Sequence, residues 1–207
     1  MTRYLFTLLL FISMPSMADE QELLELLESI QSSSETVKKA IRAGDERALL
    51  CKYCHGVDGN SKKDTIPNLA SQNPEYLMRQ FELFARGERT NKTMNELAKI
   101  LSSEDKVNIA LFFSAQQVKP QKPYKSELAE TGKKLFNTRC FFCHGKDAHG
   151  KDALPRISSQ PPAYLIRTLK SYNASEAKRA ETAMSRIGRS LEIDEIEALT
   201  AYLTTLN

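Results

Sequence analysis

The same short pattern occurs twice in the sequence, as CKYCHG at residues 51–56 and as CFFCHG at residues 140–145. All four cysteines of the chain lie in these two boxes, and two of its three histidines stand directly behind a cysteine pair. Any fold for this chain must therefore present two thiols and one imidazole close together, and must do so at two places. No other feature of the sequence limits the possible structures as strongly.

The segments that follow the two boxes also repeat. Residues 66–77 align with residues 154–165, and residues 93–113 align with residues 183–203, where the pattern of apolar positions is kept. The identical pairs in the first alignment are Pro67/Pro155, Ser71/Ser159, Gln72/Gln160, Pro74/Pro162, Tyr76/Tyr164 and Leu77/Leu165. We therefore predict two homologous domains rather than one larger fold.

The predicted domains cover residues 35–117 and 125–207. Between them, residues 118–124 read VKPQKPY, and the two prolines and two lysines of this segment indicate an extended linker. A helical segment leads into each cysteine box, and no stretch shows the sustained alternation that is typical of strands. The predicted fold class is all-α.

Two further helices can be placed from local signals. Residues 74–87 put apolar side chains on one helical face and have a proline in the first turn, where proline suits a helix start. A second helix is predicted from about Ser103 to Gln117, with Ser102 and Asp105 spaced as a capping box.

The N-terminal residues 1–18 have the layout of a secretory signal peptide. One basic residue is followed by an apolar run from Tyr4 to Met14 and by the small-x-small ending Ser16-Met17-Ala18. The apolar run is shorter than the roughly twenty residues that span a bilayer. We expect cleavage after Ala18 and a periplasmic location, with an uncleaved anchor as the alternative.

Residues 19–34 form an acidic segment with leucines along one helical face. We expect this amphipathic extension to pack on its own protein; the alternative is a surface for docking or self-association. The net charge of the whole chain is +3, which excludes a strongly basic nucleic-acid-binding protein.

The C-x-x-C-H pattern is the attachment sequence of c-type haem. Its two thiols add to the two vinyl groups of the porphyrin, and the histidine behind them is directed at the iron. A lone C-x-x-C would also suit a dithiol or half of a zinc site. Neither alternative explains a histidine directly behind each pair, so we favour covalent haem on Cys51 and Cys54, and again on Cys140 and Cys143.

Each haem iron then needs a second axial ligand besides His55 or His144. The repeat aligns Met94 with Met184, and both stand at a matching distance behind their histidines. Met78 aligns with an isoleucine and is interpreted as a core residue. His149 lies too close behind His144 to reach the opposite haem face easily, so an exposed loop histidine is favoured over a ligand.

Four motifs together resemble the dihaem class I cytochromes c of the cytochrome c4 type. They are CHG-x-DGNS at 54–61, P-x-LA-x-Q-x-x-YL-x-x-Q at 67–80, G-x-R-x-x-x-x-M at 87–94 and LS-x-ED at 101–105. The resemblance implies two tandem class I cytochrome c domains related by pseudo-twofold symmetry, each with a haem c and His/Met ligation. It also implies that the carbonyls of Pro67 and Pro155 orient the histidines. The second half lacks the Gly-x-Arg element, so the loop before Met184 is reshaped.

Histidine and methionine on opposite faces leave the iron six-coordinate, without an open position for a substrate. We therefore expect a soluble periplasmic electron carrier and no enzymatic activity. It would carry one electron per haem from a quinol-oxidising complex or dehydrogenase to a terminal oxidase or reductase. Its partners would be redox proteins, without nucleic acid and with at most peripheral membrane association. The alternatives are a dihaem peroxidase or sulfur-compound oxidase, and an electron-transfer subunit of a larger oxidase.

Overall fold

The computed structural model describes residues 15–173 and 183–206. These residues form helices and loops; the described part contains an isolated bridge between Lys151 and Leu154 but no strand. The predicted all-α class is confirmed. Most of the predicted signal peptide lies outside the described residues, and its cleavage after Ala18 stays a prediction.

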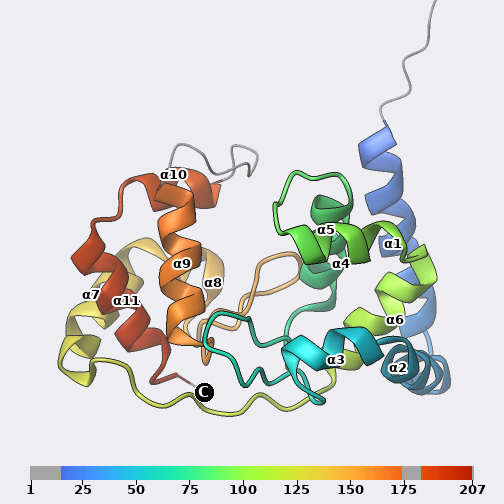
Figure 1. Ribbon diagram of the computed structural model, residues 1–207, viewed down its shortest axis with the longest axis horizontal. Helices are drawn as coiled ribbons and strands as arrows, with labels where there is room; N and C mark the ends of the chain where they lie inside the picture. The colour runs from blue at the N-terminus through green and yellow to red at the C-terminus, as the bar shows by residue number, and fades with distance from the viewer. Residues whose placement is uncertain (1–14, 174–182, 207) are drawn as a thin grey trace, which may run out of the picture.

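The helices gather in two groups that repeat one order of elements (Figure 1). The first group comprises α1 (Pro15–Gln31), α2 (Ser34–Arg47), α3 (Leu49–His55), α4 (Pro74–Ala85), α5 (Lys92–Lys99) and α6 (Ser103–Ser114). The second comprises η1 (Ser126–Leu128), α7 (Ala129–Arg139), α8 (Phe141–His144), α9 (Pro162–Asn173), α10 (Ala183–Arg189) and α11 (Ile193–Leu203). No helix or strand is assigned to residues 118–123, which run between the groups. The domain limits 35–117 and 125–207 stay a prediction.

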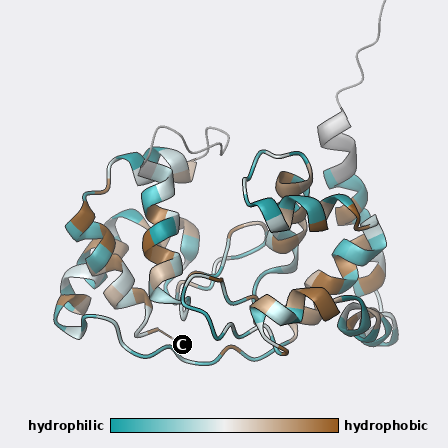
Figure 2. Ribbon diagram, in the orientation of Figure 1, coloured by the Kyte–Doolittle hydropathy of each residue, from teal (hydrophilic) through white to brown (hydrophobic). Residues whose placement is uncertain are grey.

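The helix signals of the first half act as expected. Pro74 opens α4, which buries Leu77, Phe81 and Phe84 on one face. At the start of α6 the Ser102 hydroxyl accepts from the Asp105 amide at 3.1 Å, and the Asp105 carboxylate accepts from the Ser102 amide at 3.3 Å. This is the predicted capping box. Figure 2 shows hydrophobic and hydrophilic residues side by side on helices such as α9.

In each half the helix that leads into the cysteine box packs against the last helix at a glycine. Helix α2 lies against α6 and α7 against α11. A Cβ atom added at Gly44 would lie well under 3.0 Å from the Asn108 carbonyl oxygen, and one added at Gly132 would lie equally close to the Ala198 carbonyl oxygen. Only glycine allows backbones to approach this closely. The same contact in both halves supports the duplication.

Helix α1 packs on the core of the first half. Leu23 and Leu27 are 2% and 3% exposed and belong to the same apolar cluster as Met78 and Phe113. The interpretation of the acidic segment as a helix packed on its own protein is confirmed, because its apolar face is covered. Met78, 2% exposed, is a core residue as predicted. Within the described residues, no helix has both the length and the apolar character needed to cross a bilayer.

Candidate haem-binding site

Both cysteine boxes form the short helical turns that the pattern requires. Cys51, Cys54 and His55 lie on α3, while Cys140 directly precedes α8 and Cys143 and His144 lie on it. The glycines behind the histidines, Gly56 and Gly145, end these helices with φ values of 86° and 76°. Residues with a Cβ atom rarely adopt such φ values, so the backbone conformation explains why glycine stands at this position of each CHG sequence.

The four cysteines are unpaired and partly buried. Burial raises the pKa of the Cys51 thiol and raises that of Cys140 to about 11. Redox-active dithiols depend instead on a lowered pKa. The described residues also contain no group of three or more His, Cys, Asp or Glu side chains that could hold a metal ion. Both alternatives to haem attachment, a dithiol and a zinc site, therefore lack support in the geometry.

Both box histidines are buried and oriented by a proline carbonyl. The Nδ1 atom of His55 lies 2.9 Å from the Pro67 carbonyl oxygen, and Nδ1 of His144 lies 3.0 Å from that of Pro155. Because a carbonyl can only accept, each Nδ1 carries the proton and donates it. Burial lowers the pKa of both imidazoles and favours the neutral form. Each ring thus keeps the lone pair on Nε2 for a metal ion.

A cavity of about 710 Å³ lies between the two helical groups and contacts both boxes. Its volume is in the range of about 300–1,000 Å³ that is typical of cofactor pockets. The predicted site residues along its wall are Cys54, His55, Pro67 and Met94 from the first half and His144, Pro155 and Met184 from the second. Of the other cysteines, Cys51 and Cys140 pack against the apolar clusters of their halves. The structure therefore brings both predicted His and Met pairs to one space, and its donor set fits haem iron.

The backbone at Met94 is anchored by asparagines. The Asn91 side chain caps α5 by accepting from the Met94 amide at 3.0 Å. The Asn95 side chain donates to the Arg89 carbonyl at 2.8 Å, which ties down the loop before the helix. These bonds fix where the Met94 side chain begins.

Met184 is positioned differently. It is the second residue of α10, and the predicted reshaped loop before it lies largely in residues 174–182, outside the described residues. Helix α10 packs against α9 at Gly188, where an added Cβ atom would collide with Tyr172. This close packing fixes the helix that carries Met184.

His149, the third histidine of the chain, does not belong to the cavity wall. It lies exposed in the loop behind α8, and its carbonyl oxygen accepts from the Asn73 side chain at 3.1 Å. The prediction of an exposed loop histidine is confirmed.

Two glutamines join the halves in a reciprocal way that the sequence did not reveal. Gln72 of the first half hydrogen-bonds both backbone polar groups of Arg156 in the second half, at 2.9 and 2.7 Å. Gln160 of the second half does the same for Asn68 in the first, at 2.9 Å for each bond. The sequence does show that glutamine stands at both equivalent positions of the repeat alignment, 72 and 160. It does not show which residue each glutamine binds, because that residue lies in the other half.

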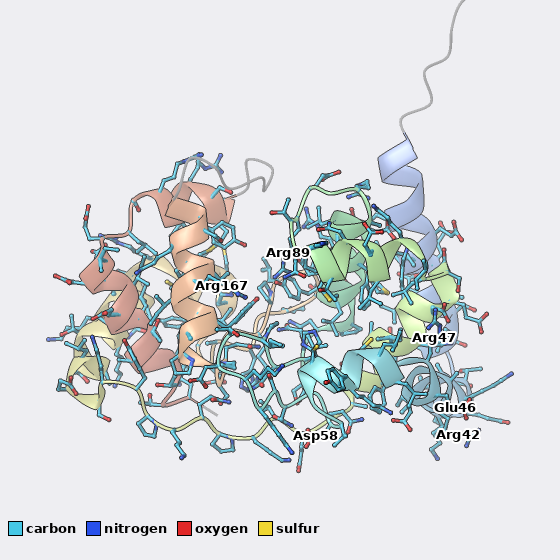
Figure 3. The ribbon with its side chains drawn as sticks, viewed as in Figure 1. Arg42, Glu46, Arg47, Asp58, Arg89 and Arg167 are labelled. Carbon is cyan, nitrogen blue, oxygen red and sulfur yellow. The ribbon has the colours of Figure 1, made fainter. Side chains whose placement is uncertain are left out.

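Arginines supply the charge of the cavity wall. Arg89 and Arg167 lie on facing sides of the boundary between the groups (Figure 3), and Arg156 is the third arginine of the wall. Arg89 donates to Gln80 at 2.6 Å and to the Tyr164 hydroxyl at 3.3 Å, so it also bridges the halves. The cavity is therefore suited to a ligand with negative charge.

Comparison with known proteins agrees with this geometry. The family model described as cytochrome C oxidase, cbb3-type, subunit III matches residues 127–203. Cytochrome c4 from Stutzerimonas stutzeri is 30% identical over an alignment 187 positions long, which covers 80% of this chain and 88% of that protein. The chain belongs to the cytochrome c4 family. The crystal structure of reduced recombinant cytochrome c4 from Pseudomonas stutzeri superposes with a TM-score of 0.73 at 30% identity, over 80% of this chain and 98% of the other.

A second kind of relative has a different name. A protein of Stutzerimonas stutzeri called thiosulfate dehydrogenase electron acceptor is 27% identical over an alignment 196 positions long, which covers 87% of this chain and 91% of that protein. Family membership confirms two class I cytochrome c domains, covalently bound haem c and a role in electron transfer. The chain is an electron carrier rather than an enzyme.

Proposed function

We propose that this cytochrome is a periplasmic carrier of two electrons, one on each haem. It accepts them from a quinol-oxidising complex or a dehydrogenase and delivers them to a terminal oxidase or reductase. The observation that carries the proposal is the presence of one histidine and one methionine from each half on the wall of the same cavity. Two equivalent ligand pairs suit two centres that do the same work.

The proposed roles of the site residues follow from their chemistry. Cys51 and Cys54 would hold the first haem by thioether bonds, and Cys140 and Cys143 would hold the second. His55 with Met94 would ligate the first iron, and His144 with Met184 the second. Haem iron supplies reversible one-electron redox chemistry when bound.

The ligand set then decides between carrier and enzyme. The soft methionine sulfur favours Fe(II) and raises the reduction potential relative to bis-histidine ligation. Two protein ligands on each iron would leave no position for a substrate, which suits electron transfer. Pro67 and Pro155 would orient the histidine rings toward the iron, since their carbonyls accept the Nδ1 protons at 2.9 and 3.0 Å.

Two observations support the choice of compartment and partners. Residues 1–18 have the layout of an export signal. The relative named thiosulfate dehydrogenase electron acceptor makes a dehydrogenase a reasonable electron donor for this chain as well. The match of residues 127–203 to a cbb3-type oxidase subunit favours, as a second candidate, a place within a larger oxidase.

A kinetic experiment tests the proposal. Purified, fully reduced protein is mixed with membranes of the source cells, and its reoxidation is followed optically with and without an inhibitor of terminal oxidases. We expect rapid reoxidation of both haems that the inhibitor abolishes. Reoxidation at the same slow rate with and without membranes would contradict delivery to an oxidase. Gel filtration of a mild detergent extract separates a free carrier from an oxidase subunit, which would elute with the complex.

A further inference from the structure

Arg156 is a buried cation whose two terminal nitrogens have no hydrogen-bond partner among the described residues. Its side chain lies on the cavity wall and the residue is 3% exposed. Both terminal nitrogens, Nη1 and Nη2, are buried and find no hydrogen-bond acceptor in the part of the chain that the structure describes. Buried charged groups in proteins are nearly always paired, because an uncompensated one is costly. Arg89, on the same wall, shows the usual situation, with acceptors on Gln80 and Tyr164.

The described residues that line the cavity include three arginines and no aspartate or glutamate that could neutralise Arg156. Burial lowers the pKa of Arg156 to about 10, which still leaves the guanidinium charged at neutral pH. Since the described wall offers no counter-ion, the group that occupies the cavity is the natural source of one.

The backbone of Arg156 is held firmly at this place. The preceding residue, Pro155, accepts the hydrogen bond of His144, and Gln72 of the other half binds both backbone polar groups of Arg156. The guanidinium therefore starts from a fixed point beside the second haem site, at the boundary with the first.

We propose that the Arg156 guanidinium binds a propionate carboxylate of haem in this cavity. The inference rests on the proposed haem sites and adds an anion-binding residue to them. Haem is the expected occupant and carries two propionates, and a guanidinium with two free terminal nitrogens matches a carboxylate in bidentate geometry. Two charge-assisted hydrogen bonds would then satisfy the nitrogens that otherwise have no acceptor.

The two halves differ at this position. Asn68 is the equivalent of Arg156, and its side chain is already occupied: Oδ1 accepts from the Ser61 amide and Nδ2 donates to the Ser159 carbonyl, each at 2.8 Å. The second half alone therefore places a cation here. A fixed positive charge stabilises the reduced, less positive haem, so Arg156 raises the potential of the haem that it contacts and separates the two potentials.

Potentiometric titration of the holoprotein tests this proposal with three variants. Arg156→Gln removes the charge, Arg156→Lys keeps it without the fork geometry, and Arg42→Gln is the control. Arg42 is exposed on α2 and is not among the residues that line the cavity. We expect Arg156→Gln to make reduction of one haem about tenfold less favourable, which corresponds to about 59 mV for one electron. We expect a smaller loss in Arg156→Lys and little change in Arg42→Gln.

Two results would overturn the proposal: unchanged potentials in Arg156→Gln, or an equal fall in Arg42→Gln. If Arg156→Gln fails to retain haem, a crystal structure of the unmodified holoprotein decides. Arg156 nitrogens within hydrogen-bond distance of a propionate support the proposal, and any other placement contradicts it. The methionine–iron absorption band is recorded in parallel. If the unmodified protein does not show this band, the proposed methionine ligands are wrong. The shift in reduction potential tests Arg156 separately.

Discussion

The side-chain amide of Gln72 binds both backbone polar groups of Arg156 across the boundary between the halves. Its Nε2 donates to the Arg156 carbonyl oxygen at 2.9 Å, and its Oε1 accepts from the Arg156 amide at 2.7 Å. Gln160 binds Asn68 in the same way. Arg156 and Asn68 directly follow the prolines whose carbonyls orient the two box histidines. Each half thus helps to fix the histidine of the other, so the interface and the two box histidines form one connected structure.

Replacing Gln72 with alanine should therefore lower the stability of the protein and change the reduction potential of the haem in the second half. The variant leaves two buried backbone groups of Arg156 without partners, which costs about 1–3 kcal/mol in the free energy of unfolding. We also expect a shift in the reduction potential of the haem on Cys140 and Cys143, because the backbone beside Pro155 loosens. Denaturant unfolding and potentiometric titration measure the two effects.

Gln21→Ala is a matched control for this variant, because Gln21 is exposed and bonds only the neighbouring Glu25 side chain on α1. It should change neither quantity. A Gln72→Ala protein whose second haem titrates as before would show that the cross-domain bonds do not affect the histidine.

Helix α1 should contribute to the stability of the first half. Leu27 is 3% exposed in the core cluster, and its replacement with alanine leaves a cavity that costs about 2–5 kcal/mol. Thermal unfolding followed at the haem absorbance should show an earlier transition for the first domain. Glu22→Ala, at an exposed position of the same helix, should leave the transition in place. Equal stability of both variants would contradict the packing of α1.

The glycine contacts of α2 with α6 and of α7 with α11 should not tolerate a methyl group. Gly132→Ala places a Cβ atom against the Ala198 carbonyl oxygen, and relief of this overlap requires the helices to separate. Overpacking of this kind costs about 1–3 kcal/mol or more. Chemical denaturation measures the loss, and Lys133→Ala at the exposed neighbouring position of α7 is the control. A Gly132→Ala protein as stable as Lys133→Ala would refute the close approach.

Local signals in the sequence predicted much of the fold and most of the residues that meet at the candidate site. The repeated C-x-x-C-H boxes, the capping box at Ser102 and the alignment of Met94 with Met184 all depend on spacing along the chain. The roles of Gln72, Gln160 and Arg156 could not be predicted in this way. Their partners lie in the other half of the molecule or in the cavity between the halves, and a single sequence does not show which surfaces of two domains meet. The identity of the glutamines in the repeat was visible, but it equally suited a structural role within each half.

The proposed function requires two equivalent His/Met centres in one chain. Ferric-state absorption and magnetic spectroscopy of the purified holoprotein should be compared with those of Met94→Ala and Met184→Ala. We expect low-spin iron at both sites of the unmodified protein and loss of half of the methionine–iron charge-transfer band in each variant. High-spin iron in the unmodified protein, or a variant that keeps the full band, would show that the proposed ligands are wrong.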